Sequence, residues 1–127
     1  MPCVIVRGKE AKQLKKSTLF GPGDEKAYNF QAIASPVSRN MTAGYLRLRE
    51  GYTKEFVSPV DEVDLFLEGS LTYSCEGKSF TARKGDIAFI EKGSKVKFTA
   101  DEDCFVFFVT YHLMQEAIEA LRKQNEK

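Results

Sequence analysis

At 127 residues the chain has the length of one domain, and a domain of this size buries about two thirds of its unfolded surface on folding. Its 19 basic and 18 acidic side chains leave a formal net charge of +1, which argues against a protein that collects nucleic acid by long-range attraction. No stretch approaches the roughly 20 apolar residues that a membrane-spanning helix requires, so we expect neither a nucleic-acid partner nor a membrane partner.

Short apolar runs rich in Val, Ile, Phe and Tyr recur along most of the chain. Glycine, proline, aspartate, asparagine and serine separate them at intervals of about ten residues, which is typical of an all-β protein. We expect strands at 4–6, 18–20, 28–33, 43–48, 62–68, 71–75, 79–82, 86–90, 95–99 and 104–111.

The period of the apolar residues changes after residue 111. One apolar stripe recurs at spacings of three and four, through Leu113, Met114, Ala117, Ile118 and Leu121. This pattern predicts a C-terminal α-helix over about 112–124 that packs against a domain core at about 28–111. A helix that binds another protein is the alternative.

Side-chain alternation predicts how the strands are covered, because successive residues of a strand point to opposite faces. Lys95 and Lys97 alternate with Val96 and Phe98, so this strand has one solvated face and one buried face. The strand at 104–111 is apolar on both faces through most of its length, which indicates cover on both sides. A second sheet, the N-terminal segment or another subunit must supply that cover.

Two glycine-bounded segments resemble the two motifs of cupins. Glu62 is followed by six residues and Gly69, and Gly85 is followed by seven residues and Gly93. The resemblance implies a single cupin domain over 1–127, an all-β double-stranded β-helix or jelly-roll barrel with a C-terminal α-helix. Because many cupins pair through their sheets, it also implies a homodimer.

The histidines that hold a metal in cupins are missing from these motifs. Counted back from Glu62, their positions fall on Phe56 and Ser58, or on Glu55 and Val57 in the longer spacing, and the second motif ends in Val96. Transition metals in such barrels need imidazole ligands, so we predict no cupin-type metal centre. His112, the one histidine, is expected to be structural or exposed, since a catalytic zinc site requires three protein ligands.

A closer resemblance is carried by three segments. They are Asp61-Glu-Val-Asp-Leu-Phe-Leu-Glu-Gly69, Ala82-Arg-Lys-Gly-Asp-Ile-Ala-Phe-Ile-Glu-Lys-Gly-Ser94 and Phe105-Val-Phe-Phe-Val-Thr-Tyr111. Together they are similar to the cupin domain of the EutQ family of ethanolamine-utilisation proteins. The resemblance implies a role in ethanolamine catabolism and its bacterial microcompartment, and an acetate kinase activity that would use ATP and Mg²⁺.

The acidic residues of the first motif are the leading candidates for a site. If Glu62 and Asp64 both point into the barrel, their mutual repulsion and their burial raise at least one pKa, and such carboxyls are candidates for acid or base catalysis. They could also hold Mg²⁺, which accepts carboxylate oxygens and keeps several waters. The structural alternative pairs them with Arg47, Arg49 or Lys54 at the barrel mouth.

Three further residues are candidates for contacts with a ligand. Tyr45, Arg47 and Tyr73 lie on expected strands, where they could direct polar groups into the barrel. The alternative for the tyrosines is a place in the hydrophobic core. The chain lacks the GxxxxGK[ST] loop of many nucleotide-binding proteins, so the residues themselves add no support for phosphoryl transfer.

Two hypotheses of function therefore remain. The first is a EutQ-like enzyme, an acetate kinase, that binds its small polar ligand in an acid-lined barrel. The second is a non-catalytic module of a metabolic compartment that binds a small molecule, a shell protein or an enzyme. The odd number of cysteines, Cys3, Cys75 and Cys104, favours a reduced, cytoplasmic location in either case.

Overall fold

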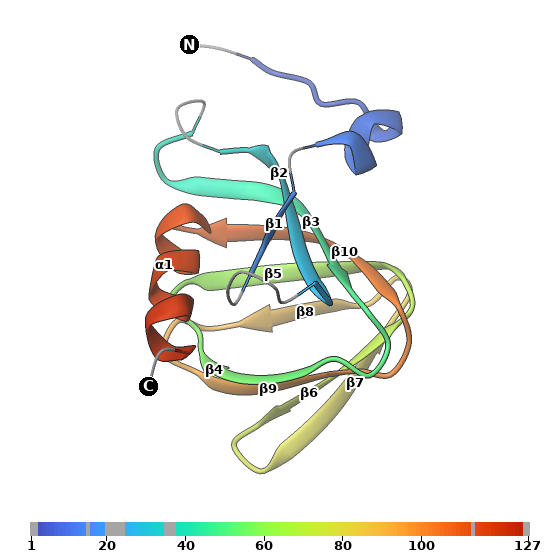
Figure 1. The fold of residues 1–127 in the computed structure, drawn as a ribbon, viewed down its shortest axis with the longest axis vertical. Helices are drawn as coiled ribbons and strands as arrows, with labels where there is room; N and C mark the ends of the chain where they lie inside the picture. The colour runs from blue at the N-terminus through green and yellow to red at the C-terminus, as the bar shows by residue number, and fades with distance from the viewer. Residues whose placement is uncertain (1–2, 15, 20–24, 35–37, 113, 126–127) are drawn as a thin grey trace.

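Two antiparallel sheets face one another and enclose the hydrophobic core of the protein (Figure 1). The fold is taken from a computed structural model that describes residues 3–14, 16–19, 25–34, 38–112 and 114–125. This arrangement confirms the predicted all-β cupin barrel with a C-terminal helix.

The larger sheet has six strands in the order β1-β2-β3-β10-β5-β8. Their bounds are β1 Lys16–Thr18, β2 Ala27–Ile33, β3 Met41–Leu48, β5 Asp61–Glu68, β8 Ile87–Ile90 and β10 Cys104–Tyr111. The central strand β10 pairs with β3 on one side and with β5 on the other, so residues far apart in sequence meet here.

The smaller sheet has four strands in the order β4-β9-β6-β7. Their bounds are β4 Thr53–Val57, β6 Ser70–Cys75, β7 Lys78–Arg83 and β9 Lys95–Ala100. The hairpin of β6 and β7 extends beyond the barrel at the lower edge of Figure 1. Phe98 and Val96 of β9 are buried while Lys95 and Lys97 are exposed, which confirms the predicted wet and dry faces.

Helix α1, Met114–Asn125, lies against one end of the barrel (Figure 1). Its side chains Ala117, Ile118 and Leu121 are buried in the core. Gln124 binds the free edge of β4 at both ends of its amide, accepting from Val57 N and donating to Val57 O, both at 2.9 Å. The described part of the apolar stripe therefore packs against its own domain, as predicted.

The expected strands from 28–33 onward are all found, with bounds shifted by at most two residues. Four predictions need correction or completion. Residues 4–6 form no strand, a 3₁₀ helix follows at Gly8–Gln13, and β4 was not predicted. The strand expected at 18–20 is β1, which spans Lys16–Thr18. Phe20 and Leu113, which belonged to predicted elements, lie outside the described residues.

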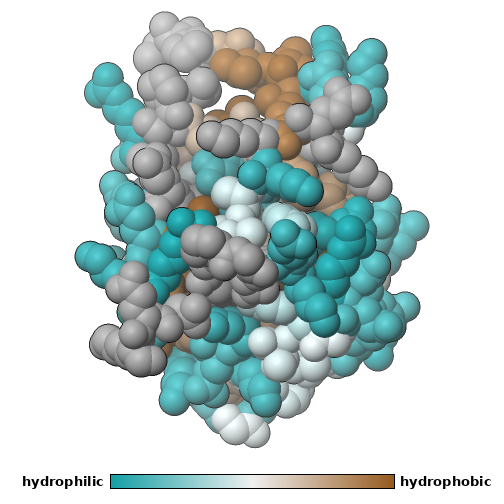
Figure 2. Space-filling model, viewed as in Figure 1, coloured by the Kyte–Doolittle hydropathy of each residue, from teal (hydrophilic) through white to brown (hydrophobic). Residues whose placement is uncertain are grey.

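Strand β4 escaped prediction because its residues are largely polar and its pairing is electrostatic as well as hydrogen-bonded. Glu55 lies opposite Lys97 in the register with β9 and forms an ion pair of 3.4 Å with Lys95. The prediction of a strand at residues 4–6 was wrong for the opposite reason. Val, Ile and Val favour a strand, but an isolated strand leaves its backbone groups without partners. Val4 and Ile5 are instead exposed, and Figure 2 shows a brown, hydrophobic area at the top, where the N-terminal segment lies in Figure 1.

The outer face of the six-stranded sheet carries exposed apolar side chains. Ile87 and Phe89 of β8 are 71% and 62% exposed, and Val63 and Tyr111 are 42% and 51% exposed. The chain itself thus covers the inner face, whereas on the outer face it covers Phe105 of β10 but leaves these four side chains exposed. None of the helices among the described residues combines the length and the apolar character that crossing a bilayer requires.

Candidate functional site

Two of the acidic side chains of β5, those of Glu62 and Asp64, point into the barrel. Along this strand Glu62, Asp64 and Phe66 are buried and alternate with Val63 and Leu65 on the outer face, as the two-residue period of a strand dictates. Asp64 is 1% exposed and Glu62 is 8% exposed. The prediction that both carboxyls face the interior is confirmed.

Tyr73 reaches the same point from the opposite sheet. Its hydroxyl donates a hydrogen bond of 2.7 Å to Asp64 Oδ2, and this bond links β6 to β5 across the barrel. The ring is held edge-on against Phe98, at 5.1 Å between centroids, and against Phe66, at 6.1 Å. Because these aromatic contacts fix the ring, the hydroxyl is held in place for Asp64.

Burial controls the ionisation of these three groups. Desolvation raises the pKa of Glu62 well above 4.5, and the charge of Asp64 beside it and their mutual hydrogen bond raise it further. Burial also raises the pKa of Asp64, but hydrogen bonds from Glu62 and Tyr73 oppose that rise because they favour the charged form. Burial raises the pKa of Tyr73 far above its ordinary value, so its hydroxyl keeps its proton.

These directions indicate the order in which the two carboxyls ionise. The charge of Asp64 raises the pKa of Glu62, whereas hydrogen bonds from Glu62 and Tyr73 lower that of Asp64, so Asp64 ionises first and the last proton of the pair lies on Glu62. Asp64 Oδ1 is buried and has no N–H or hydroxyl partner among the residues described, so a protonated Glu62 is the group that can satisfy it. With that one proton bound, the group carries one negative charge shared by two carboxyls and a tyrosine.

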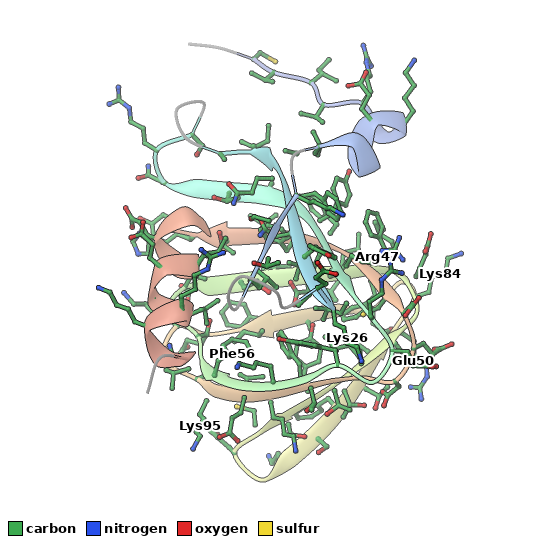
Figure 3. All side chains as sticks on the ribbon, in the orientation of Figure 1. Lys26, Arg47, Glu50, Phe56, Lys84 and Lys95 are labelled. Carbon is green, nitrogen blue, oxygen red and sulfur yellow. The ribbon has the colours of Figure 1, made fainter. Side chains whose placement is uncertain are left out.

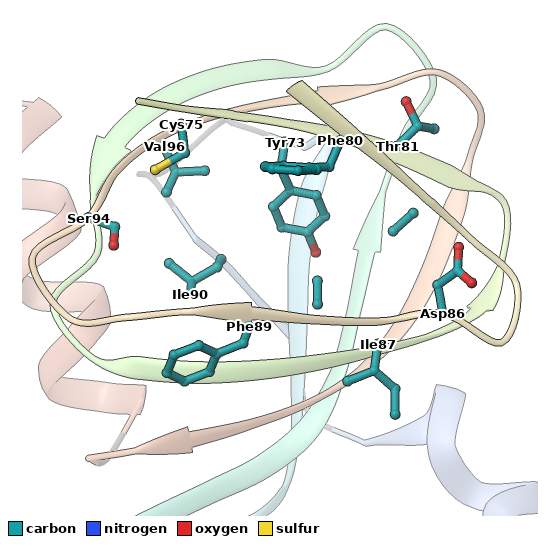
Figure 4. Close-up of a pocket in the computed structure, with 12 residues that line it drawn as sticks. Tyr73, Cys75, Phe80, Thr81, Asp86, Ile87, Phe89, Ile90, Ser94 and Val96 are labelled. Atoms are coloured by element: carbon teal, nitrogen blue, oxygen red, sulfur yellow. The ribbon is translucent and has the colours of Figure 1, made fainter. Parts of the chain in front are cut away.

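A cavity of about 480 Å³ opens from the solvent to Tyr73. Figure 4 shows the Tyr73 ring projecting into the middle of this pocket, between Asp86 near one end and Ser94 near the other. Its walls come from β6, β7, β8 and β9. The residues that line it with backbone or side-chain atoms are Tyr73, Cys75, Phe80, Thr81, Ala82, Asp86, Ile87, Ala88, Phe89, Ile90, Ser94 and Val96.

Three polar residues of this cavity were not predicted as site residues. Thr81, Asp86 and Ser94 line it, although Thr81 and Asp86 were expected only as members of the strands at 79–82 and 86–90. The available signal for Asp86 and Ser94 was their place beside the glycines of the second cupin-like motif. A turn residue becomes part of a site only when the turn borders a cavity, and one sequence does not show that.

Glu62 adjoins a second, much smaller space beneath helix α1. This space holds about 20 Å³ and is bounded by apolar side chains that include Leu46, Phe98 and Leu121. Such a volume accommodates about one water molecule. The acidic pair therefore lies between a large open cavity on the Tyr73 side and a small, mainly apolar space on the helix side.

Tyr45 and Arg47 do not join this group. They alternate on β3 with the buried residues Leu46 and Leu48, so their side chains lie on the outer face of the sheet. There Tyr45 stacks on Phe105 at 5.2 Å between centroids, and the Arg47 guanidinium lies 4.9 Å from the same ring. Figure 3 shows Arg47 at the edge of the barrel, and the expectation that both residues support the acidic pair is not met.

The structural alternative, in which basic side chains pair with the two acids at the barrel mouth, does not match the positions of the two arginines. Arg49, one of the proposed partners, forms its ion pair of 3.2 Å with Asp103 on the surface, and Arg47 lies over Phe105. Glu62 and Asp64 are interior residues, not rim residues. Neither of the two arginines in that alternative therefore neutralises the buried carboxyls.

The remaining candidate side chains lie apart from the pair. His112 is exposed at the end of β10 and lines a shallow groove of about 270 Å³ with Lys92 and Glu116. Burial raises the pKa of the Cys104 thiol to about 12, which makes it a poor nucleophile at neutral pH. The described residues contain no cluster of three His, Cys, Asp or Glu side chains able to hold a metal ion.

Comparison with known proteins places these features in a family. A curated relative from Clostridioides difficile, "Acetate kinase EutQ", is 30% identical over 91 residues, which are 72% of this chain and 57% of the relative. The Escherichia coli protein of the same name is 31% identical over 57% of this chain and 30% of its own length. The chain thus spans little more than half of the first relative and less than a third of the second.

Solved structures agree with this similarity. The Clostridium difficile EutQ protein superposes with a TM-score of 0.64 at 27% identity, over 68% of each chain. An ectoine synthase from P. lautus superposes with a TM-score of 0.72 over 93% of this chain and 86% of its own, but its 10% identity speaks for the shared fold alone. A profile of the family described as "Ethanolamine utilisation protein EutQ" matches residues 6–115, and the chain therefore belongs to the EutQ family.

Proposed function

We propose that this protein binds a small polar ligand in its barrel as part of ethanolamine utilisation. One observation carries the proposal: the cavity of about 480 Å³ ends at a tyrosine hydroxyl that is hydrogen-bonded to a buried carboxylate. Ligand sites combine mainly apolar walls with a few fixed polar groups. Ile90 and Val96 supply such walls, and Tyr73 supplies the fixed polar group.

The energetics of the acidic pair also favour a functional role. Burying two carboxyls side by side costs stability, and an apolar pair of similar size would avoid that cost. Shifted carboxyls in a cavity are common at functional sites because the shift is useful for binding or proton transfer. Glu62 and Asp64 are therefore proposed as the functional centre, with Tyr73 as the group between them and the ligand.

The binding proposal is tested by mapping ligands onto the cavity. Amide chemical shifts would be followed by NMR while ethanolamine, acetate, acetyl phosphate and ATP with Mg²⁺ are added in turn. Ala88→Leu fills the inner wall and should abolish binding, whereas Ala43→Leu makes the same change on the outer face and should not. If no compound perturbs residues around Tyr73, or if Ala88→Leu leaves binding intact, the cavity is not the site.

Acetate kinase activity is the second candidate, and the names of the curated relatives favour it. The reaction would require ATP and Mg²⁺, for which carboxylate oxygens are suitable ligands. As the two acids lie, however, Glu62 adjoins only about 20 Å³ of space, whereas Mg²⁺ retains several waters. The residues do not fit a hydrated magnesium ion in this arrangement, and we derive no phosphoryl-transfer step from them.

The kinase candidate has a direct assay. Purified protein would be mixed with ATP, Mg²⁺ and acetate, and acetyl phosphate would be measured. If Glu62 and Asp64 catalyse the reaction, Glu62→Gln abolishes it. Activity that is unchanged in this variant would remove the two acids from the catalytic site.

A homodimer through the outer face of the six-stranded sheet belongs to the proposal. Val63, Phe89 and Tyr111 are large, apolar and exposed there, and a patch of this kind on a soluble protein often marks an interface. A second copy offers the same apolar face, so each copy would cover the other. Light scattering should give twice the monomer mass, and Val63→Glu should halve it.

A microcompartment shell protein or an enzyme is the other occupant of that face. In that case the isolated protein is a monomer by light scattering. A pull-down with purified shell proteins then retains the wild type, and Val63→Glu loses them. A monomer that also retains no shell protein would leave the assembly hypothesis without support.

A further inference from the structure

We infer that the ligand of the cavity is a small primary ammonium compound and not a carboxylate or a phosphate. The inference rests on the proposed function, because it names the chemical class that the cavity beside Tyr73 accepts. It is argued from the direction of one hydrogen bond, from the charges that line the cavity and from its apolar walls.

The hydrogen bond between Tyr73 and Asp64 has only one available direction. A carboxylate has no proton to donate, so the Tyr73 hydroxyl is the donor over the 2.7 Å to Asp64 Oδ2. Its single hydrogen is then used, and its oxygen presents lone pairs alone to the cavity. A ligand group that meets this oxygen must therefore be a donor, which an ammonium or a hydroxyl is and a carboxylate or phosphate anion is not.

The surroundings of Asp64 favour this direction. Hydrogen bonds from Glu62 and Tyr73 lower the pKa of Asp64 against the effect of burial, whereas the charge of Asp64 raises the pKa of Glu62, so Asp64 is the carboxyl that ionises first. Asp64 Oδ1 is buried and lacks an N–H or hydroxyl partner among the residues described. With Asp64 ionised the inner end of the cavity is negative, and a positive charge brought next to Tyr73 is attracted to it.

The lining of the cavity contains an acid and no base. Asp86 is one of its residues, and one carboxylate oxygen of Asp86 accepts from Arg83 N at 2.8 Å. No lysine or arginine is among the lining side chains that the structure describes; Lys84 belongs to the turn at the periphery (Figure 3). An anion that entered would meet the negative charges of Asp86 and Asp64 without a cation to offset them.

The walls suit the carbon part and the charge of a small amine. Ile90 and Val96 supply apolar contacts, and Phe80 lies beside Tyr73 in the pocket (Figure 4). The faces of aromatic rings attract ammonium groups, so the two rings add to the preference for a cation.

The experiment compares probes of nearly equal size that differ in charge. Ethanolamine, ethylene glycol and glycolate are all two-carbon compounds with a hydroxyl group. Their second group is an ammonium, a neutral hydroxyl and a carboxylate, respectively. In NMR titrations, ethanolamine should shift the signals of Tyr73 and Ala88 and should bind with at least tenfold higher affinity than ethylene glycol. Glycolate should give none.

Asp64→Asn is the decisive variant. The amide can still accept the Tyr73 hydrogen bond, but the negative charge is gone, so we expect ethanolamine affinity to fall at least tenfold while ethylene glycol affinity is unchanged. A merely structural role for Asp64 would weaken both probes alike. Should Asp64→Asn not fold, Asp86→Asn at the exposed rim carries the same test, with a smaller loss for ethanolamine alone.

The possible results separate the two proposals. If glycolate, acetate or acetyl phosphate binds at Tyr73 and ethanolamine does not, the ammonium inference is overturned and the ligand-binding function stands. If none of the probes perturbs the cavity residues, the binding function itself fails. Equal affinity for ethanolamine and ethylene glycol would contradict the electrostatic argument specifically.

Discussion

Replacing Glu62 with Gln should change how the stability of this protein depends on pH. Below pH 4.5 Glu62 is protonated in both the folded and the unfolded state. As the pH rises, the unfolded state releases this proton first, because burial raises the pKa of Glu62 in the folded state. Burial raises the pKa of Asp64 as well, so both carboxyls reduce the free energy of unfolding as the pH increases.

The size of the Glu62 contribution follows from proton linkage. Over the interval between 4.5 and the raised pKa of Glu62, the folded state holds one proton more at this site than the unfolded state. The free energy of unfolding then falls by up to about 1.4 kcal/mol per pH unit. Glutamine has nearly the same shape, can donate to Asp64 and does not ionise, so the variant lacks this part of the slope.

Urea denaturation between pH 4 and pH 8 measures the difference. We expect Glu62→Gln to gain stability relative to the wild type with increasing pH, at about 1.4 kcal/mol per unit within the interval. Glu68→Gln, at the exposed end of the same strand, is the matched control and should run parallel to the wild type because that side chain is solvated in both states. Parallel curves for Glu62→Gln would refute the assignment of a buried proton to this residue.

Three further substitutions test the architecture around the site. Tyr73→Phe removes a hydrogen bond to a buried charge and should lower the free energy of unfolding at pH 7 by about 1.5–3 kcal/mol, with a smaller loss in acid; an equal loss at both pH values would contradict it. Gly69→Ala should cost more than about 2 kcal/mol, because φ is +78° and a Cβ would meet a backbone carbonyl, whereas Gly85→Ala at φ +90° has free space and should cost about 1 kcal/mol; similar losses in thermal melts would remove the steric argument. Gln124→Ala removes both hydrogen bonds to Val57 and should speed amide exchange at that residue, and unchanged exchange would show that the helix does not protect this edge.

The inward direction of the acids was predictable because strand β5 has a clear two-residue period. Glu62, Asp64 and Phe66 share one face, and the glycine-bounded motif identifies the strand. The same period did not show which face of β3 carries Tyr45. An interior that contains carboxyls is neither purely polar nor purely apolar, so alternation alone did not decide whether Tyr45 or Leu46 faced it.

The contact between Tyr73 and Asp64 could not be predicted because it joins two sheets. Alternation places Tyr73 on the face of β6 that carries Leu71, and both are buried. The depth at which it meets Asp64 depends on how the sheets stack, and that is set by the packing of Phe66 and Phe98 around its ring. A pattern within one strand carries no information about such a distance.

The hydrogen bond of Tyr73 links the large cavity to the acidic pair, which matters for both functional candidates. Tyr73 lines the large cavity and binds Asp64, whereas Glu62 lines the small space beneath α1. A ligand in the cavity therefore acts on the acidic pair through the tyrosine oxygen, and an anion such as acetate has no donor to meet there. If acetate kinase activity is found and survives both Glu62→Gln and Tyr73→Phe, its chemistry lies outside this cavity, and the C. difficile relative, of which this chain spans 57%, becomes the protein in which to look for it.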